Sequence, residues 1–188
     1  MSEIIEEALF EAEEKMDKTI EVAKEDFAGI RTGRANSGMF AKLMVDYYGA
    51  QTPLQQLASF NIPEARTVLI SPFDKSSMAA IEKAIRNSDL GVNPSNDGVQ
   101  IRCILPALTE ERRKDYVKLA RTKAEEARVT VRNIRRKAKD SFDKAVKDKE
   151  IGEDEGHGAH SELETLTKKH VDLIDHLLAT KEAELLEV

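Results

Sequence analysis

A row of basic residues in the second half of the chain is the pattern with the clearest chemistry. Arg121, Arg128, Arg132, Arg135 and Lys139 follow one another at intervals of 7, 4, 3 and 4 residues. On an α-helix, these intervals place all five side chains on one face. Guanidinium groups bind phosphate through paired hydrogen bonds, so this face is suited to a polyanion.

The charge around this row is one-sided. Residues 112–139 hold twelve Lys and Arg but three acids, a net charge of +9 that leaves −15 on the rest of a chain whose total is −6. Residues 128–139 contain no acid, so pairs three or four residues apart within this stretch cannot neutralise it. A charged face is most often only solvated, but a one-signed stripe on an acidic chain favours a polyanion partner.

The basic row contains no aromatic residue. Reading of single strands usually needs exposed rings on which bases stack, so the predicted target is the phosphate backbone of structured RNA or DNA. A coiled-coil protein whose basic helix pairs with an acidic protein is the alternative, which a pull-down after nuclease treatment would reveal. An RNA-processing enzyme is a third hypothesis.

Catalytic and metal-binding patterns are absent or weak. No Gly-rich phosphate loop is present. Cys103 lies in a strand-like run without a neighbouring His, which predicts a packed, inert thiol. His157 and His160 form at most a weak metal-binding pair, and His170 lies on an apolar helix face as a satisfied, semi-buried residue would. The sequence therefore predicts no enzyme, no cofactor and no metal.

Three amphipathic helices are predicted. Apolar residues recur every three or four positions over residues 109–149, which Thr109 would cap, and over residues 3–31, which Ser2 would cap. A third series begins after Ser161, and the Gly-rich residues 151–158 are predicted to form a polar turn before it. Helices that each have one apolar stripe pack best as a three-helix bundle.

Residues 32–106 have a different composition, which is rich in Pro and Gly. Strands are predicted over 43–48, 57–62, 67–70 and 99–105, a hairpin turn at Gly49-Ala50, and a short helix from Met78 towards Gly91. The chain is thus expected to be an α+β protein. It has a long bundle domain, residues 1–31 and 107–188, and an inserted small α/β domain, residues 32–106.

The chain crosses between these predicted domains twice, near residues 31–36 and 105–108. Two adjacent crossings predict a hinge, at Thr32, Gly33, Leu105 and Pro106, with a rigid elbow at the same place as the alternative. The single Cys suits a reducing compartment, and the acidic, amphipathic beginning of the chain resembles neither a signal peptide nor a membrane span. We therefore expect a cytoplasmic protein.

Blocks of residues along the whole chain resemble the ribosome recycling factor family. They include residues 30–35 (IRTGRA), 46–49 (DYYG), 88–91 (SDLG), 108–114 (LTEERRK), 131–136 (VRNIRR) and 181–185 (KEAEL). Their order and number make the resemblance specific.

The resemblance implies an L-shaped, tRNA-sized, monomeric protein that hydrolyses nothing. It would bind the 50S subunit in the 70S post-termination complex and split the subunits with elongation factor G and GTP. Family arginines fall on Arg31, Arg34, Arg132, Arg135 and Arg136. With the basic row, the predicted rRNA-binding residues are Arg31, Arg34, Arg113, Arg121, Arg128, Arg132, Arg135, Arg136 and Lys139.

Overall fold

The computed structural model describes residues 2–187; Met1 and Val188, the ends of the predicted bundle domain, lie outside the described residues. Contacts divide the chain into two compact units. Unit 1 contains residues 1–24 and 120–181, and unit 2 contains residues 25–119 and 182–188. Each unit has its own core, so each is described separately.

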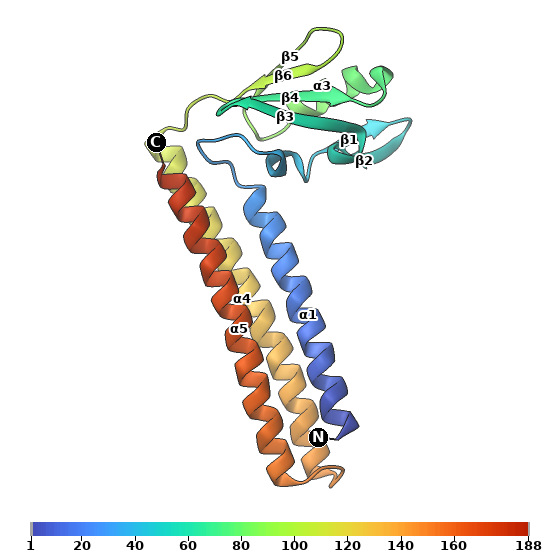
Figure 1. The fold of residues 1–188 in the computed structure, drawn as a ribbon, viewed down its shortest axis with the longest axis vertical. Helices are drawn as coiled ribbons and strands as arrows, with labels where there is room; N and C mark the ends of the chain where they lie inside the picture. Colours follow the sequence, from blue (N-terminus) through green and yellow to red (C-terminus); the bar gives the residue numbers. More distant parts are fainter. Residues whose placement is uncertain (1, 188) are drawn as a thin grey trace. The chain divides into compact units, whose positions relative to one another are not determined.

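Unit 1 is built from three long helices that run side by side (Figure 1). They belong to α1 (Glu3–Ala28), α4 (Glu110–Lys147) and α5 (Glu153–Leu186), and the division between the units falls inside all three of these helices. Their apolar stripes are buried, which confirms the predicted three-helix bundle. The buried apolar residues of this unit include Ile5, Met16, Ile20, Ala124, Val131, Ala138, Phe142, Leu163 and Ile174.

The starts of α1 and α4 are formed in different ways. The Oγ1 of Thr109 accepts a hydrogen bond of 3.2 Å from the backbone N–H of Arg112, which confirms Thr109 as a cap. Ser2 uses its backbone carbonyl, which accepts from the N–H groups of Ile5 and Glu6, while its hydroxyl is buried without a partner.

The third helix begins earlier than predicted. The sequence placed a polar turn at residues 151–158 and a cap at Ser161, but α5 already starts at Glu153. Three acids in its first turn suit the positive end of the helix dipole. Gly156 lies inside α5, where an added Cβ would stand 2.6 Å from Cγ2 of Val146. This glycine therefore permits close helix packing and does not form a turn.

Unit 2 contains a four-stranded antiparallel sheet of order β3-β4-β6-β5. Its strands are β3 (Ala58–Glu64), β4 (Thr67–Pro72), β5 (Asn93–Asn96) and β6 (Ile101–Ile104). A separate hairpin joins β1 (Met44–Tyr47) and β2 (Ala50–Pro53), and α3 (Met78–Arg86) contacts β1 and β5. The core of unit 2 includes Phe40, Val45, Leu54, Ile70, Ile81, Ile85 and Ile101.

The predicted strands and short helix of this region are confirmed, with shifted ends. The sequence analysis did not predict β2, which is short and polar, or β5, which contains Pro94 and lies at the edge of the sheet. It also missed α2 (Leu54–Leu57) and two 3-10 turns, at Ser37–Phe40 and Lys75–Ser77. The hairpin turn is formed by Tyr48 and Gly49, both with positive φ, and not by Gly49-Ala50.

Among residues 2–187, no helix combines the length and the apolar character that crossing a lipid bilayer requires.

Candidate RNA-binding surface

Six of the predicted RNA-binding residues lie along α4 in unit 1. Four of them are exposed to solvent, and Arg128 and Arg135 are half-buried. The six are Arg121, Arg128, Arg132, Arg135, Arg136 and Lys139, here called the α4 row.

Arg128 is held by two carboxylates. Its Nε and Nη2 donate to Oδ1 of Asp175 on α5, at 2.8 and 2.6 Å, and its Nη1 donates to Glu125 at 3.2 Å. Only 19% of this side chain is exposed. Burial works to lower the pKa of the Arg128 guanidinium, but the hydrogen bonds that it donates to Asp175 and Glu125 outweigh burial, and the pKa is raised. Arg128 is therefore a charged link between α4 and α5.

Arg135 forms a similar link two helix turns further on. Its Nη1 donates to Oε1 of Glu164, also on α5, at 2.5 Å. The acid-free stretch 128–139 was expected to stay unneutralised by local pairs, but acids outside this stretch pair with Arg128 and Arg135. Their partners come from α5 and from Glu125, just before the acid-free stretch, so spacing within residues 128–139 could not reveal them.

The remaining residues of the row face solvent. Arg132 has 54% of its side chain exposed and donates through Nη1 alone to Glu125, at 3.3 Å. Lys139 pairs with Asp143 at 2.5 Å. Arg136 is exposed, and within residues 2–187 it forms no ion pair. Arg132 and Arg136 thus have guanidinium N–H groups available for an external phosphate.

The other three predicted residues, Arg31, Arg34 and Arg113, belong to unit 2. Arg31 is only 8% exposed, its Nη2 donates to the carbonyl oxygen of Pro106, and its Nε is buried without a partner. Burial lowers the pKa of Arg31, nearby Arg112 and Arg66 lower it further, and Tyr116 acts in the opposite sense. Arg31 is therefore a buried cation with which no carboxylate of residues 2–187 pairs.

Like Arg31, Arg113 has an Nε atom that is buried without a hydrogen bond. Arg34 is exposed, and its backbone N–H donates to the Oγ1 of Thr32 at 3.3 Å. Arg66 and Arg112, which were not among the predicted RNA-binding residues, add to the positive charge around Arg31. Unit 2 thus holds a cluster of arginines that includes a buried, uncompensated one.

The residues predicted as a hinge lie on two segments that are tied together. The N–H of Ala35 donates to the carbonyl of Ala65 at 2.7 Å, and the N–H of Leu105 donates to the carbonyl of Arg66 at 2.8 Å. Both segments are thereby bonded to the β3–β4 turn, and the bond from Arg31 to Pro106 joins them directly.

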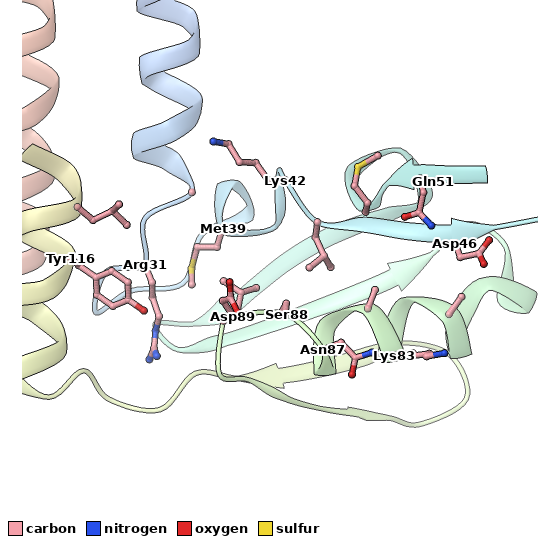
Figure 2. A pocket seen from close by; sticks show the side chains of 17 residues that line it. Arg31, Met39, Lys42, Asp46, Gln51, Lys83, Asn87, Ser88, Asp89 and Tyr116 are labelled. Atoms are coloured by element: carbon pink, nitrogen blue, oxygen red, sulfur yellow. The ribbon is translucent and has the colours of Figure 1, made fainter. Parts of the chain in front are cut away.

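A cavity of about 880 Å³ lies beside Arg31 in unit 2. Figure 2 shows Arg31 and Tyr116 at one end of it and Asp46, Gln51 and Lys83 at the other. Its apolar lining includes Met39, Leu43 and Leu90, and the hydroxyl of Ser88 donates to the carbonyl of Ile85 at 2.6 Å. The serine is thus bonded to the backbone and not to a base that would activate it.

Cys103 and His170, which the sequence predicted to be structural residues, are both buried. Cys103 is fully buried, and burial raises the pKa of its thiol to about 11, so the predicted inert thiol is confirmed. His170 is fully buried with Nδ1 2.8 Å from the carbonyl of Leu166 and Nε2 2.8 Å from Asp17, which confirms a satisfied histidine.

His157 and His160 lie inside α5, where His160 pairs with Asp143 at 2.9 Å. Among residues 2–187, no group of three or more His, Cys, Asp or Glu side chains is arranged to hold a metal ion.

Comparison with known proteins identifies the family. A family model described as ribosome recycling factor matches residues 23–186. The chain belongs to the ribosome recycling factor family. The ribosome-recycling factor of Kineococcus radiotolerans is 70% identical over 185 residues, which cover 98% of this chain and 100% of the relative. That of Renibacterium salmoninarum is 66% identical over the same lengths.

Solved structures agree with this membership. A solution structure of a ribosome recycling factor matches 100% of both chains with a TM-score of 0.79 and 41% identity. A second match, with a TM-score of 0.70 and 44% identity, covers 97% of this chain and 99% of that one. It belongs to models of the T. thermophilus ribosome recycling factor and the E. coli elongation factor G bound to the E. coli post-termination complex.

Members of the ribosome recycling factor family are translation factors and not enzymes, so this chain is a non-enzymatic translation factor of ribosome recycling. Sequence reasoning missed the carboxylates that organise the α4 row. Glu125 could have been found, because it precedes Arg128 and Arg132 by three and seven residues and therefore shares their face. Asp175 and Glu164 could not, since their pairing depends on the register between α4 and α5.

Proposed function

We propose that this factor binds the large ribosomal subunit of the post-termination ribosome through rRNA phosphates and, with elongation factor G and GTP, promotes splitting of the subunits. One observation carries the proposal: Arg132 and Arg136 present exposed guanidinium groups on α4 of a net acidic protein. Family membership and the neighbour bound to a post-termination complex support it.

Not all residues of the α4 row are suited to the same part in this binding. Arg132, Arg136 and the exposed Arg121 and Lys139 are the best candidates for direct phosphate contacts. Arg128 and Arg135 would have to share their guanidinium groups with Asp175 and Glu164. A guanidinium has five N–H donors, so a shared arginine can still bind phosphate while it links two helices.

The test is co-sedimentation with isolated 50S subunits over a salt series. Arg132→Glu with Arg136→Glu should lower the affinity more than tenfold and reduce the salt dependence, since each lost phosphate contact removes about 0.7–0.9 from the slope. The matched control is Lys18→Glu with Lys24→Glu, the same charge change on α1. Equal loss in both variants would show a general charge effect and remove the argument for the α4 row.

The domain organisation belongs to the same proposal. We infer that residues 1–31 and 107–188 act as the ribosome-binding domain and residues 32–106 as a domain that moves on Thr32, Gly33, Leu105 and Pro106. Both crossing segments lie within unit 2, where hydrogen bonds tie them to one turn and to each other. The test is energy transfer between two dyes attached to cysteines introduced at the exposed positions Glu7 and Val99. The native Cys103 is buried and should react slowly with the dyes. A single fixed distance through a full round of splitting would contradict the moving domain.

A further inference from the structure

Glu125 lies between two arginines of the α4 row. Its Oε2 accepts from Arg128 at 3.2 Å and its Oε1 accepts from Arg132 at 3.3 Å, one oxygen for each. Glu125 precedes them by three and seven residues, so all three lie on one face of α4. A carboxylate in the middle of a phosphate-binding face is the wrong charge for simple attraction, and its position needs a reason.

The contact with Arg128 fixes the position of Glu125. Arg128 is anchored on α5, because two of its nitrogens donate to Oδ1 of Asp175. Asp175, Arg128, Glu125 and Arg132 therefore form one chain of ion pairs from α5 to the solvent side of α4. Arg132, at its end, uses only Nη1 for Glu125, so its Nε and Nη2 stay available as a fork for a phosphate.

We propose that Glu125 is a positioning residue that determines which RNA the α4 row accepts: it orients Arg132 for a phosphate of folded RNA and repels phosphates that do not match this orientation. The inference rests on the proposed function, because it concerns the selectivity of that same surface.

Two effects of Glu125 act in opposite directions. Its negative charge weakens the attraction of any phosphate near Arg132. Its hydrogen bond holds Arg132 in one orientation, so a phosphate at the matching place binds without loss of side-chain freedom. Folded RNA benefits from the second effect, which offsets the first. A flexible single strand has no fixed phosphate positions, so it experiences mainly the repulsion.

The experiment compares two probes, isolated 50S subunits and poly(U), for Glu125→Gln, Glu125→Asp and the wild type. Loss of one unit charge at contact distance in water corresponds to about a fivefold change in binding. We therefore expect Glu125→Gln to bind poly(U) about fivefold more tightly and 50S subunits within about twofold of the wild type. Glu125→Asp keeps the charge but is shorter, so it should leave poly(U) binding unchanged and weaken 50S binding.

Glu126 supplies the matched control. It is the adjacent residue, is exposed, and pairs with Lys123 at 3.1 Å, outside the chain of ion pairs that ends at Arg132. Glu126→Gln removes the same charge and should change both affinities less than twofold. Glu125 is more than half exposed, so its variants should fold, which far-UV circular dichroism will check.

Three results would overturn the inference. They are a parallel change of both affinities in Glu125→Gln, an equal effect of Glu126→Gln, and wild-type 50S binding by Glu125→Asp. Failure of the wild-type protein to co-sediment with 50S subunits would instead remove the proposed function itself, and the inference with it.

Discussion

Arg128 of unit 1 and Arg31 of unit 2 are both mostly buried arginines, but their surroundings shift the pKa of the guanidinium in opposite directions. Arg128 meets Asp175 and Glu125, and the pKa of its guanidinium is raised. Arg31 donates to one backbone carbonyl, and burial together with the charges of nearby Arg112 and Arg66 lowers its pKa. A paired buried charge holds helices together, whereas an unpaired one destabilises the fold.

The same contrast extends to other residues of the two units. In unit 1, buried His170 finds acceptors for both ring nitrogens. In unit 2, Tyr48 has a φ of 50° and its side chain remains 80% exposed, so packing does not explain its strained backbone. Uncompensated features of this kind tend to persist where function requires them. The contrast concerns these residues and not the units as wholes, because Lys149 of unit 1 also has a positive φ, 58°, and the hydroxyl of Ser2 in unit 1 is buried without a partner.

The largest effect is expected from Arg31→Met. Removing a buried, unpaired charge while keeping an unbranched side chain should raise the free energy of unfolding of unit 2 by about 1–3 kcal/mol. Urea unfolding followed by tyrosine fluorescence measures this, because all three tyrosines lie in unit 2. Arg66→Met removes a nearby but exposed charge and should change the value by less than about 0.5 kcal/mol. A lower free energy of unfolding for Arg31→Met would contradict the claim that the buried charge of Arg31 destabilises unit 2.

In unit 1, removal of one charge is expected to lower the free energy of unfolding. Asp175→Ala leaves Arg128 without its main partner and should lower the free energy of unfolding by about 1–2 kcal/mol, a value reduced from that of fully buried pairs because Asp175 is half exposed. The double variant Arg128→Met with Asp175→Ala should recover most of this loss, because no unpaired charge remains. Thermal unfolding by far-UV circular dichroism measures both. Additive losses in the double variant would mean that Arg128 contributes by packing alone.

A smaller effect is expected at the β1–β2 turn. Tyr48 and Gly49 form a turn in which both residues have positive φ, a conformation that Asn adopts far more readily than Tyr. Tyr48→Asn should therefore stabilise unit 2 by up to about 1 kcal/mol, less the loss of the 3.2 Å contact between the Tyr48 hydroxyl and Ser76. Tyr48→Phe removes that contact and keeps the strain, so it should be slightly less stable than the wild type. Fluorescence of the remaining tyrosines in urea separates these outcomes.

Asp74 is expected to have the smallest effect. Its contribution to stability changes only in acid. Hydrogen bonds from the Ser76 side chain and backbone, and from Tyr47, lower the pKa of this carboxyl below 3.8. The folded state therefore binds its proton less readily than the unfolded state. Its stabilisation is complete above the ordinary pKa and is lost as the pH falls through the folded one. Asp74→Asn should reduce the difference in urea midpoint between pH 6 and pH 3, and an unchanged difference would exclude Asp74 as a source of acid sensitivity.

Much of the fold follows from local patterns in the sequence. The intervals of apolar residues located three helices because a helix buries one stripe whatever it packs against. The start of α5 was missed because Gly156 looks like a turn residue until Val146 is seen against it. The edge strand β5 was missed because its Pro94 is acceptable only where no hydrogen bond is needed.

Residue types and helical spacing are enough to assign α4 a basic face. Which of its arginines remain available depends on how the helices pack. Asp175 and Glu164 reach Arg128 and Arg135 from α5, some thirty to fifty residues away in the chain, and the burial of Arg31 depends on the segment around Pro106. Pairing and desolvation are properties of neighbours in space, and spacing along one helix does not contain them.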